Sequence, residues 1–494
     1  MKKNIYKSIV CSFAALAFSS CVNNWLETEP CNGVDASTAI TSSEDLFNAR
    51  TAMYQILKGT LSYPDYYGAR MIYYGDVRGE DMQNEPSGSR TQALYSMSFK
   101  TASDAPTIWQ TPYIVIRRAN RILEAAAGEL GGDPEAIKQY SAEAKVVRAL
   151  AHFDLVRVYG KTYTADNGAS LGVPVVTSAL DTEAKPSRSS VSEVYAQVLE
   201  DLTDAINSNN LPTDFTPGYI NVWAAKAILT RVYLTMGDNS KALSTAEDII
   251  QNSPYRLWAN SEYVSAFSKT DPNHQYEILF ELAMTGTTDW VDREGIANIY
   301  NEDGYADAIA TESFLNMMKE DPDDVRWNIL EAPHTEQFKN LYGTNHVFVN
   351  KYLAMNAVNS IPLFRLSEVY LSAAEAASKL NENSKAAQYL NAIVLRANPN
   401  YNNGNGIPES DVTLSRILIE RRKELIGEGQ RFFDAMRNNE TIVRYTSEAD
   451  QGWHRILTKE AQSYNRDYFK SILPIPQSEL NVNENMVNQQ NPGY

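Results

Sequence analysis

Apolar residues recur along most of the chain at the three- and four-residue spacing of amphipathic helices. The longest such run lies within 134–160, at Ile137, Tyr140, Ala144, Val147, Ala151, Leu155 and Val158. Pro134 suits the first turn of this helix, and Gly160 suits its end. Capping-box patterns mark two further helix starts, Thr41 with Glu44 and Ser190 with Glu193. The pattern therefore predicts a mainly α-helical protein.

Several of these helices are expected to form stacked hairpins. One stretch matches the offsets of a tetratricopeptide repeat, at Leu229, Tyr233, Gly237, Ala242 and Pro254. Its turn, GDNSKAL at 237–243, resembles NENSKAA at 381–387, and the helices at 134–160 and 413–427 are further candidates. Such units stack because none buries its apolar face alone. The alternative is a set of generic helical hairpins without superhelical stacking.

Long irregular segments separate the predicted hairpins, at 60–108, 161–189, 255–310 and 330–360. Within them, the alternating run at 276–282 predicts a short strand. Segments of this length in a compact protein are usually functional or disordered. Their high content of Tyr and Trp argues against disorder, so we expect ordered, functional loops.

The first 20 residues have the composition of a secretory signal. Three lysines precede an apolar stretch at 9–18 that is too short to cross a bilayer as a helix. Cys21 follows the small residues of the expected cleavage site, as in a bacterial lipobox. We therefore expect its thiol to be acylated and to anchor the mature chain in a membrane. An ordinary signal peptide with an unrelated cysteine is the alternative.

Charge and cysteine content exclude several classes of protein. The whole chain has a net charge of −17, and removal of the three signal lysines makes it −20. Such a surface disfavours nucleic acid and anionic lipid as partners. Cys31 would have no partner but the acylated Cys21, so no disulfide framework is expected. The five histidines are scattered, and we expect neither a metal site nor a cofactor.

Four segments together resemble the SusD/RagB family of outer-membrane lipoproteins. They are a W..PY..I.RAN.IL pattern at 109–123, SAEAKVVRALAHFDLVRVYGKTY at 141–163, IERRKELIGEGQRFFDAMRNN at 419–439 and ILPIPQSELNVNENMVNQQNPGY at 472–494. With the lipobox, these segments span the chain in the order that the family shows.

The resemblance implies a SusD-like fold: tetratricopeptide-like helical hairpins with long irregular loop insertions and a few short strands. It divides the chain into a signal peptide (1–20), a tether (21–42), an N-terminal SusD-like helical region (43–254) and a C-terminal RagB/SusD region (255–494). It implies a lipid anchor in the outer membrane, facing the cell surface. It also implies that the protein captures an oligosaccharide or peptide and passes it, without catalysis, to a SusC-like TonB-dependent transporter.

Two of these segments also have a direct physical interpretation. The 419–439 segment alternates in charge at helical spacing, at Arg421, Arg422, Glu424, Glu428, Arg431 and Asp434. We expect a structural ion-pair network that joins neighbouring turns or helices. In the 472–494 segment, the Pro-Ile-Pro run disfavours helix before each proline. We therefore expect the C-terminal tail to lie extended across the body.

Motifs for catalysis are weak. GASLG at 168–172 lacks the flanking strand and helix of a nucleophile elbow, and YGKT at 159–162 lacks the earlier glycine of a phosphate-binding loop. The acidic run at 320–324 lacks the glycine spacing of a calcium loop, which favours a solvated turn. The run at 75–81 brings together Asp76, Glu80 and Asp81, and two carboxylates about 5–10 Å apart can hydrolyse a glycoside. A lipid-anchored glycoside hydrolase is therefore the main alternative to a binding protein.

Binding has better support, because the chain has 29 Tyr, 15 Phe and 7 Trp, many of them in the predicted loops. Aromatic rings contact the apolar faces of sugars, while Asn, Asp and Arg bond their hydroxyl groups. The candidate ligand contacts are Tyr66, Tyr67, Tyr73, Tyr74, Asp76, Arg78, Trp290, Arg293, Tyr300 and Tyr305. For each residue, packing within the loops or against the transporter is the alternative.

The sequence therefore predicts a non-enzymatic nutrient-binding lipoprotein that takes glycan in preference to peptide. A repeat-built scaffold that binds only envelope proteins is a further alternative. Such a scaffold needs only its concave helical face, so the aromatic insertions argue against it.

Overall fold

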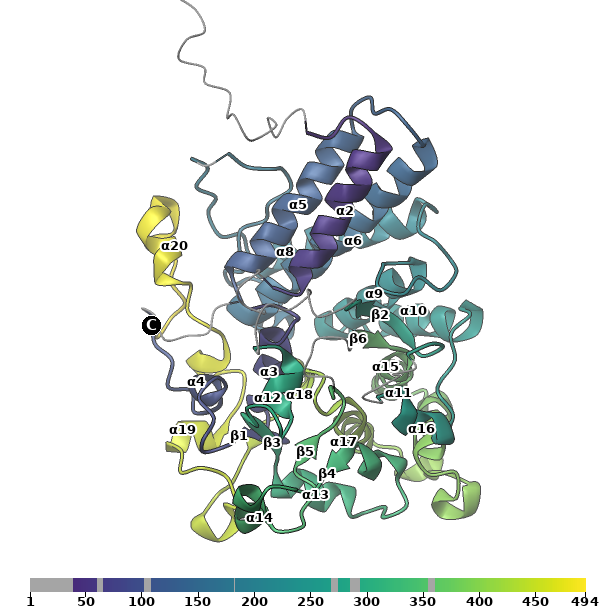
Figure 1. Ribbon diagram of the computed structural model, residues 1–494, viewed down its shortest axis with the longest axis vertical. Coiled ribbons are helices and arrows are strands. Elements are labelled where there is room, and N and C mark those ends of the chain that lie inside the picture. The colour runs from purple at the N-terminus through teal and green to yellow at the C-terminus, as the bar shows by residue number, and fades with distance from the viewer. Residues whose placement is uncertain are drawn as a thin grey trace, which may run out of the picture.

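The computed structural model describes residues 39–59, 65–101, 108–181, 183–267, 274–284, 294–353 and 360–494. The signal peptide, Cys21, Trp290 and Arg293 lie outside these residues. Helices dominate the fold (Figure 1), as the apolar spacing predicts. The main helices are α2 (Ser43–Leu57), α5 (Gln110–Ala126), α6 (Pro134–Tyr159), α8 (Val191–Asn207), α9 (Val222–Met236), α10 (Asn239–Asn252), α15 (Leu366–Lys379), α16 (Asn383–Ala397), α17 (Leu414–Leu425) and α18 (Arg431–Arg437). Within the described ranges, none of the helices combines the length and apolarity that a membrane span requires.

The first four of these helices form a bundle, in which α2 packs on α5, α5 on α6 and α6 on α8 (Figure 1). The long helix predicted at 134–160 is α6, and the capping box predicted at Ser190 and Glu193 begins α8. The cap predicted at Thr41 and Glu44 is wrong by one residue. Ser42 is the N-cap of α2, because its hydroxyl accepts the Asp45 backbone N–H.

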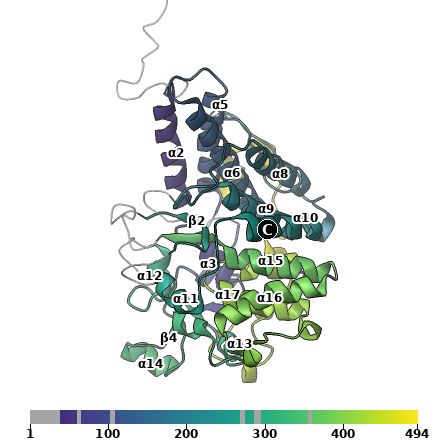
Figure 2. The same ribbon diagram turned by 90° about the vertical axis from the view of Figure 1, so that its right-hand side faces the viewer.

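The remaining long helices continue the stack, with α9 on α10, α10 on α15 and α15 on α16 (Figure 2). The two turns with similar sequences have the same backbone form. Gly237 has φ +78° and Asn381 has φ +62°, and the next residue in each case bonds to the carbonyl five positions earlier. This is the left-handed helix ending that Gly and Asn favour. The repeated hairpins predicted from the sequence are therefore confirmed.

The described parts of the long insertions contain short helices and strands. The helices are α3 (Arg70–Val77), α4 (Gln92–Tyr95), α7 (Tyr163–Asp166), α11 (Asn260–Ala266), α12 (Ile296–Tyr300), α13 (Glu312–Met318) and α14 (Glu336–Tyr342), and near the C-terminus α19 (Lys459–Gln462) and α20 (Gln477–Val482). Four antiparallel pairs join β1 (Met82–Asn84) to β3 (Ala308–Ala310), β2 (Ile278–Leu282) to β6 (Ile361–Arg365), β4 (Leu330–Glu331) to β5 (Phe348–Val349) and β7 (Ile442–Val443) to β8 (Ser463–Tyr464). The strand predicted at 276–282 is β2, shorter by two residues.

The 419–439 segment is two helices, α17 and α18, rather than one. Gly427 and Gly429 between them have φ values of +78° and +74°, which end the first helix. The turn also approaches α3 closely, because a Cβ on Gly75 would lie 1.8 Å from the Gly429 carbonyl oxygen. Only glycine at position 75 permits this contact.

The charges of this segment are buried and paired, which confirms the expected structural network. Arg421 joins Asp434 on α18 to Glu368 on α15. Deeper in the body, the fully buried Arg365 contacts Glu277, Glu424 and Glu428 at 2.7, 2.9 and 2.6 Å. Ion pairs therefore connect the helical repeats to β6 and to Glu277, the residue before β2.

The C-terminal tail lies across the body as predicted, but it is not extended throughout, because α20 begins directly after Pro476. The Leu473 N–H donates to the Val158 carbonyl at the end of α6. The Asn491 amide donates to the Tyr159 carbonyl at 2.8 Å, and the Arg188 guanidinium donates to the Gln489 carbonyl at 2.6 Å. The tail is thus fastened to the N-terminal bundle.

Candidate functional site

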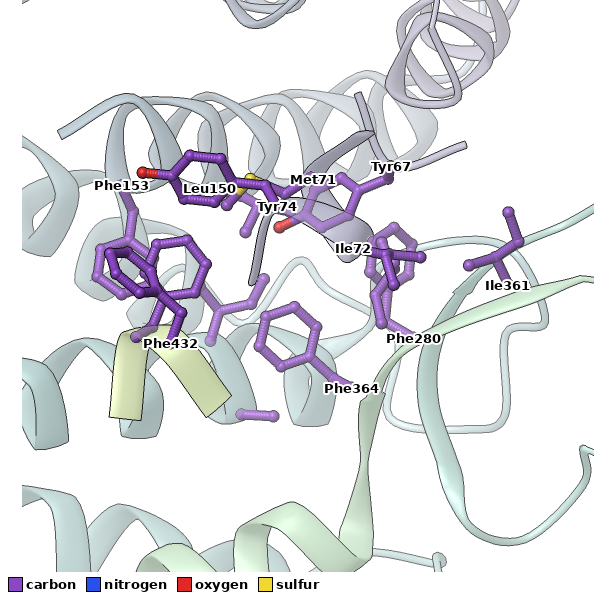
Figure 3. Packing of buried hydrophobic residues seen from close by; sticks show 14 of the residues in the cluster. Tyr67, Met71, Ile72, Tyr74, Leu150, Phe153, Phe280, Ile361, Phe364 and Phe432 are labelled. Atoms are coloured by element: carbon purple, nitrogen blue, oxygen red, sulfur yellow. The ribbon is translucent and has the colours of Figure 1, made fainter. Parts of the chain in front are cut away.

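The four tyrosines predicted as ligand contacts in the first loop point into the interior. Tyr66, Tyr67, Tyr73 and Tyr74 are all buried. Figure 3 shows Tyr67 and Tyr74 within the hydrophobic cluster that also contains Phe364. The Tyr66 hydroxyl donates to the Asp154 carboxylate on α6 at 2.6 Å. In this arrangement the four side chains stabilise the core and are out of reach of a ligand from solvent.

Asp76, Arg78 and Tyr300 are buried as well. The Tyr300 hydroxyl donates to Asp76 at 2.7 Å, and the Gly429 N–H donates to its other oxygen at 3.0 Å. The Arg78 guanidinium lies over the Phe432 ring at 4.0 Å. Their burial argues against the direct ligand contacts expected from the sequence. Their contacts instead join α3, α12 and α18. Tyr305 alone among the eight described candidates is partly exposed, with the Arg90 guanidinium on its ring.

The acidic cluster at 75–81 is also internal. The Glu80 carboxylate forms a double hydrogen bond with Arg431 at 2.9 and 2.6 Å, and Asp81 pairs with Arg422. Burial alone would raise the pKa of Glu80, but the two arginines outweigh it and lower the pKa to about 2. The Glu80 carboxylate is therefore ionised, and both Glu80 and Asp81 are paired with arginines and buried. They do not form the acid and nucleophile that the glycosidase alternative requires.

Asp76 gives the fold a distinctive dependence on pH. Burial raises its pKa to about 7, although the bonds from Tyr300 and Gly429 lower it in part. A carboxyl whose pKa is higher in the folded state than in the unfolded state stabilises the protein at low pH, and this contribution is lost as the pH rises from about 4 to about 7.

We therefore expect Asp76→Asn to remove this slope. The variant should gain stability relative to wild type as the pH increases, by on the order of 4 kcal/mol at pH 8. Urea unfolding of both proteins across this pH range measures the difference in their free energies of unfolding. Other carboxyl groups titrate in both proteins, so their contributions cancel in this difference. Parallel curves would contradict the assignment.

A solvent-accessible cavity of about 700 Å³ lies along β2. Its described lining consists of Phe215, Thr216, Pro217, Gly218, Tyr255, His274, Gln275, Tyr276, Ile278, Leu279, Phe280, Glu281 and Ser360. Successive residues of β2 contribute because the pairing with β6 shifts register twice, on either side of Phe280. Such bulges break the alternation of a strand and redirect its side chains.

Three aromatic rings form one wall of this cavity. The centroid of the Phe215 ring lies 4.6 Å from that of Tyr255 and 6.3 Å from that of Tyr276, and both pairs of rings meet edge to face. Phe215 and Tyr276 are 43% and 36% exposed, although most aromatic side chains in the described residues are buried. Exposed rings beside a concave polar surface match the mixed apolar and polar character of a sugar.

The backbone presents Tyr276 at a cost in strain. Its φ is +74°, and the Glu277 N–H donates to the Gln275 carbonyl at 3.0 Å, which makes a γ-turn of the rare, strained type. Trp258 holds the turn, since its backbone N–H donates to the Glu277 carboxylate and its indole N–H donates to the Gln275 carbonyl. Strain retained by surrounding contacts is typical of functional positions.

The turn is also attached to the buried ion network. Glu277 is fully buried, and its carboxylate pairs with Arg365 at 2.7 Å and Arg396 at 3.3 Å. With Glu277 drawn inward, the preceding residue is forced outward into the cavity. The sequence showed these residues only as the start of a strand, and turn signals near the site, such as Thr-Pro-Gly at 216–218, did not indicate a cavity.

A second cavity of about 560 Å³ lies beside the C-terminal tail, where Trp109, Tyr113 and Glu479 are among its lining residues. Trp109 is buried and its indole N–H points to Glu479 at 3.3 Å. The Trp109 ring is therefore unavailable for stacking on a ligand, and the cavity at β2 is the better candidate for the binding site.

Comparison with known proteins agrees with this architecture. A family model described as "SusD family" matches residues 200–494, and one described as "Starch-binding associating with outer membrane" matches residues 24–234. A SusD superfamily protein from Bacteroides thetaiotaomicron is 35% identical, with a TM-score of 0.82 over 92% of this chain and 100% of that one.

Two further relatives extend the comparison. SusD-like protein P38 from Formosa agariphila is 25% identical and covers 90% of this chain and 93% of its own. A structure named "Laminarin binding SusD-like protein" shares the fold at 22% identity, with a TM-score of 0.71 over 92% of this chain and 100% of that one. The chain belongs to the SusD/RagB family.

Proposed function

We propose that this protein binds glycans non-covalently in the cavity at β2. The observation that carries the proposal is the strained, exposed Tyr276, whose ring contacts Phe215 edge to face on the wall of the cavity. A protein that used this segment only for packing would gain stability from an unstrained backbone and a buried ring. The description of one matched family model as starch-binding, and the name of the laminarin-binding structure with the same fold, support a sugar as ligand.

The proposal includes delivery to a partner. The bound oligosaccharide would pass to a SusC-like TonB-dependent transporter, with Cys21 as the lipid anchor in the outer membrane and the cavity facing the cell surface. The family description supports association with the outer membrane. Trp290, Arg293 and Tyr305 stay candidates for additional ligand contacts. No catalytic step is proposed, because the acidic cluster considered for hydrolysis is paired and buried.

Phe215→Ala is expected to weaken binding about tenfold or more, because truncating a central aromatic contact commonly costs over 1 kcal/mol. The measurement is titration calorimetry with wild type and variant against a panel of oligosaccharides and peptides. Phe47→Ala is the matched control, since Phe47 is equally exposed, at 43%, but lies on α2.

The outcomes are distinct. Loss of oligosaccharide binding in Phe215→Ala but not in Phe47→Ala supports the site. Binding of peptides alone would overturn the choice of glycan, and equal binding by both variants and wild type would overturn the location.

A further inference from the structure

Two polar groups on the cavity wall retain unused hydrogen-bonding capacity. They are the Nε2 atom of His274 and the hydroxyl proton of Tyr255. Both side chains line the same cavity as Phe215 and Tyr276. Buried polar atoms normally have partners, so an unused one on a cavity wall points to a ligand.

The acceptor is set by a hydrogen bond between His274 and Glu281. The His274 Nδ1 atom lies 2.6 Å from Glu281 Oε2, and the two side chains are 9% and 11% exposed. A carboxylate can only accept, so Nδ1 carries the proton, and in the neutral ring Nε2 bears a lone pair. Nε2 has no partner among the described residues. It is thus a preformed acceptor for a ligand O–H.

The donor is set by a helix cap. Asn221 is the N-cap of α9, and its Oδ1 accepts the Ala224 N–H at 2.9 Å. Its Nδ2 must therefore donate, to the Asp214 carbonyl at 3.0 Å and to the Tyr255 hydroxyl at 2.7 Å. The Tyr255 oxygen accepts this bond, and among the described residues its own proton has no acceptor, so the proton is available to a ligand. Burial raises the pKa of Tyr255 to about 12, so the proton is retained at neutral pH.

The charge of the cavity wall disfavours acidic ligands. Within the described lining, Glu281 is the sole acidic residue, and no Lys or Arg is present. The nearest arginine in sequence, Arg256, is absent from this lining; its guanidinium lies over the Tyr276 ring at 4.1 Å and pairs with Glu262. A carboxylate or sulfate on a ligand would meet an acceptor and a negative charge without a compensating cation.

We propose that His274 and Tyr255 form a donor–acceptor pair that selects uncharged, hydroxyl-bearing rings, so that the cavity takes neutral glycans and rejects acidic ones. A sugar hydroxyl donates and accepts at once and satisfies both groups, whereas a carboxylate satisfies only the donor. The inference rests on the proposed function, because it assigns a ligand class to the same cavity.

The binding test uses calorimetry in mildly alkaline buffer. The probes are a panel of neutral gluco-, manno-, xylo- and galacto-oligosaccharides and, as acidic probes, oligogalacturonates. We expect neutral probes alone to bind, and His274→Ala and Tyr255→Phe each to weaken the best binder about tenfold, which corresponds to about 1.4 kcal/mol. His334→Ala is the matched control, because His334 also pairs with carboxylates but lies outside the cavity.

A spectroscopic readout separates recognition from a merely structural role. In ¹⁵N spectra of the histidine side chains, His274 should show the Nδ1–H tautomer, and its Nε2 resonance should shift on addition of the best neutral probe. Glu281→Gln, whose amide can itself donate to Nδ1, should permit the other tautomer and lower the affinity without unfolding the protein.

Preferred binding of oligogalacturonates, binding of no neutral probe, or unchanged affinity and spectra in the His274 and Tyr255 variants would each overturn the inference. If Phe215→Ala abolishes binding while the His274 and Tyr255 variants bind as wild type, the proposed function stands and this inference alone fails. If no oligosaccharide binds at all, both fail.

Discussion

Arg365→Met is expected to lower the free energy of unfolding by about 3–5 kcal/mol. The side chain is fully buried and pairs with three carboxylates, those of Glu277, Glu424 and Glu428. Methionine fills much of the volume but leaves these acids with less compensating charge. An uncompensated buried charge costs far more than the net value of the pair it came from.

Urea unfolding of the two proteins measures this effect. Lys385→Met serves as the control, because Lys385 pairs with Glu247 and Glu382 at the surface and is 45% exposed. Exposed pairs contribute about 0–1 kcal/mol, so the control should unfold close to wild type. A loss of less than 1 kcal/mol in Arg365→Met would show that the network is not a main support of the fold.

Substitutions of Tyr276 are expected to separate the role of its ring in binding from the strain of its backbone. Tyr276→Gly and Tyr276→Ala both remove the ring, and each should weaken glycan binding about 10–100-fold. At φ +74°, alanine bears the strain that glycine avoids, so Tyr276→Gly should be the more stable of the two by about 1 kcal/mol. Tyr276→Phe keeps the ring and should retain most of the affinity.

Calorimetry and urea unfolding on the three variants test this pair of expectations. Tight glycan binding by Tyr276→Gly would show that the Tyr276 ring does not contribute to the binding site. Equal stability of the glycine and alanine variants would show that the backbone at residue 276 is not strained.

Local sequence signals predicted much of the scaffold. The spacing in 134–160, the capping box at Ser190 and the turns at Gly237 and Asn381 all depend on neighbours within a few residues. The alternating charges of 419–439 also predicted the ion network. Its burial was not predictable, because the partners Glu368, Glu80 and Asp81 come from other segments.

The binding site was harder to predict, because tyrosine suits both a core and a sugar site. Tyr66 resembles a surface residue in sequence, yet Asp154, 88 positions away, accepts its hydroxyl and permits burial. In contrast, Tyr276 reads as part of a strand, and only the backbone reveals its strained turn. The exposed ring of Phe215 comes from a third segment, so no local pattern joins the two.

The structure of the protein with a bound neutral oligosaccharide tests the central claim most directly. We expect a sugar ring packed against Phe215 and Tyr276, with hydroxyl groups bonded to His274 Nε2 and the Tyr255 hydroxyl. A sugar bound elsewhere, for example at Trp109 and Tyr113, with the cavity at β2 left empty, would contradict the account.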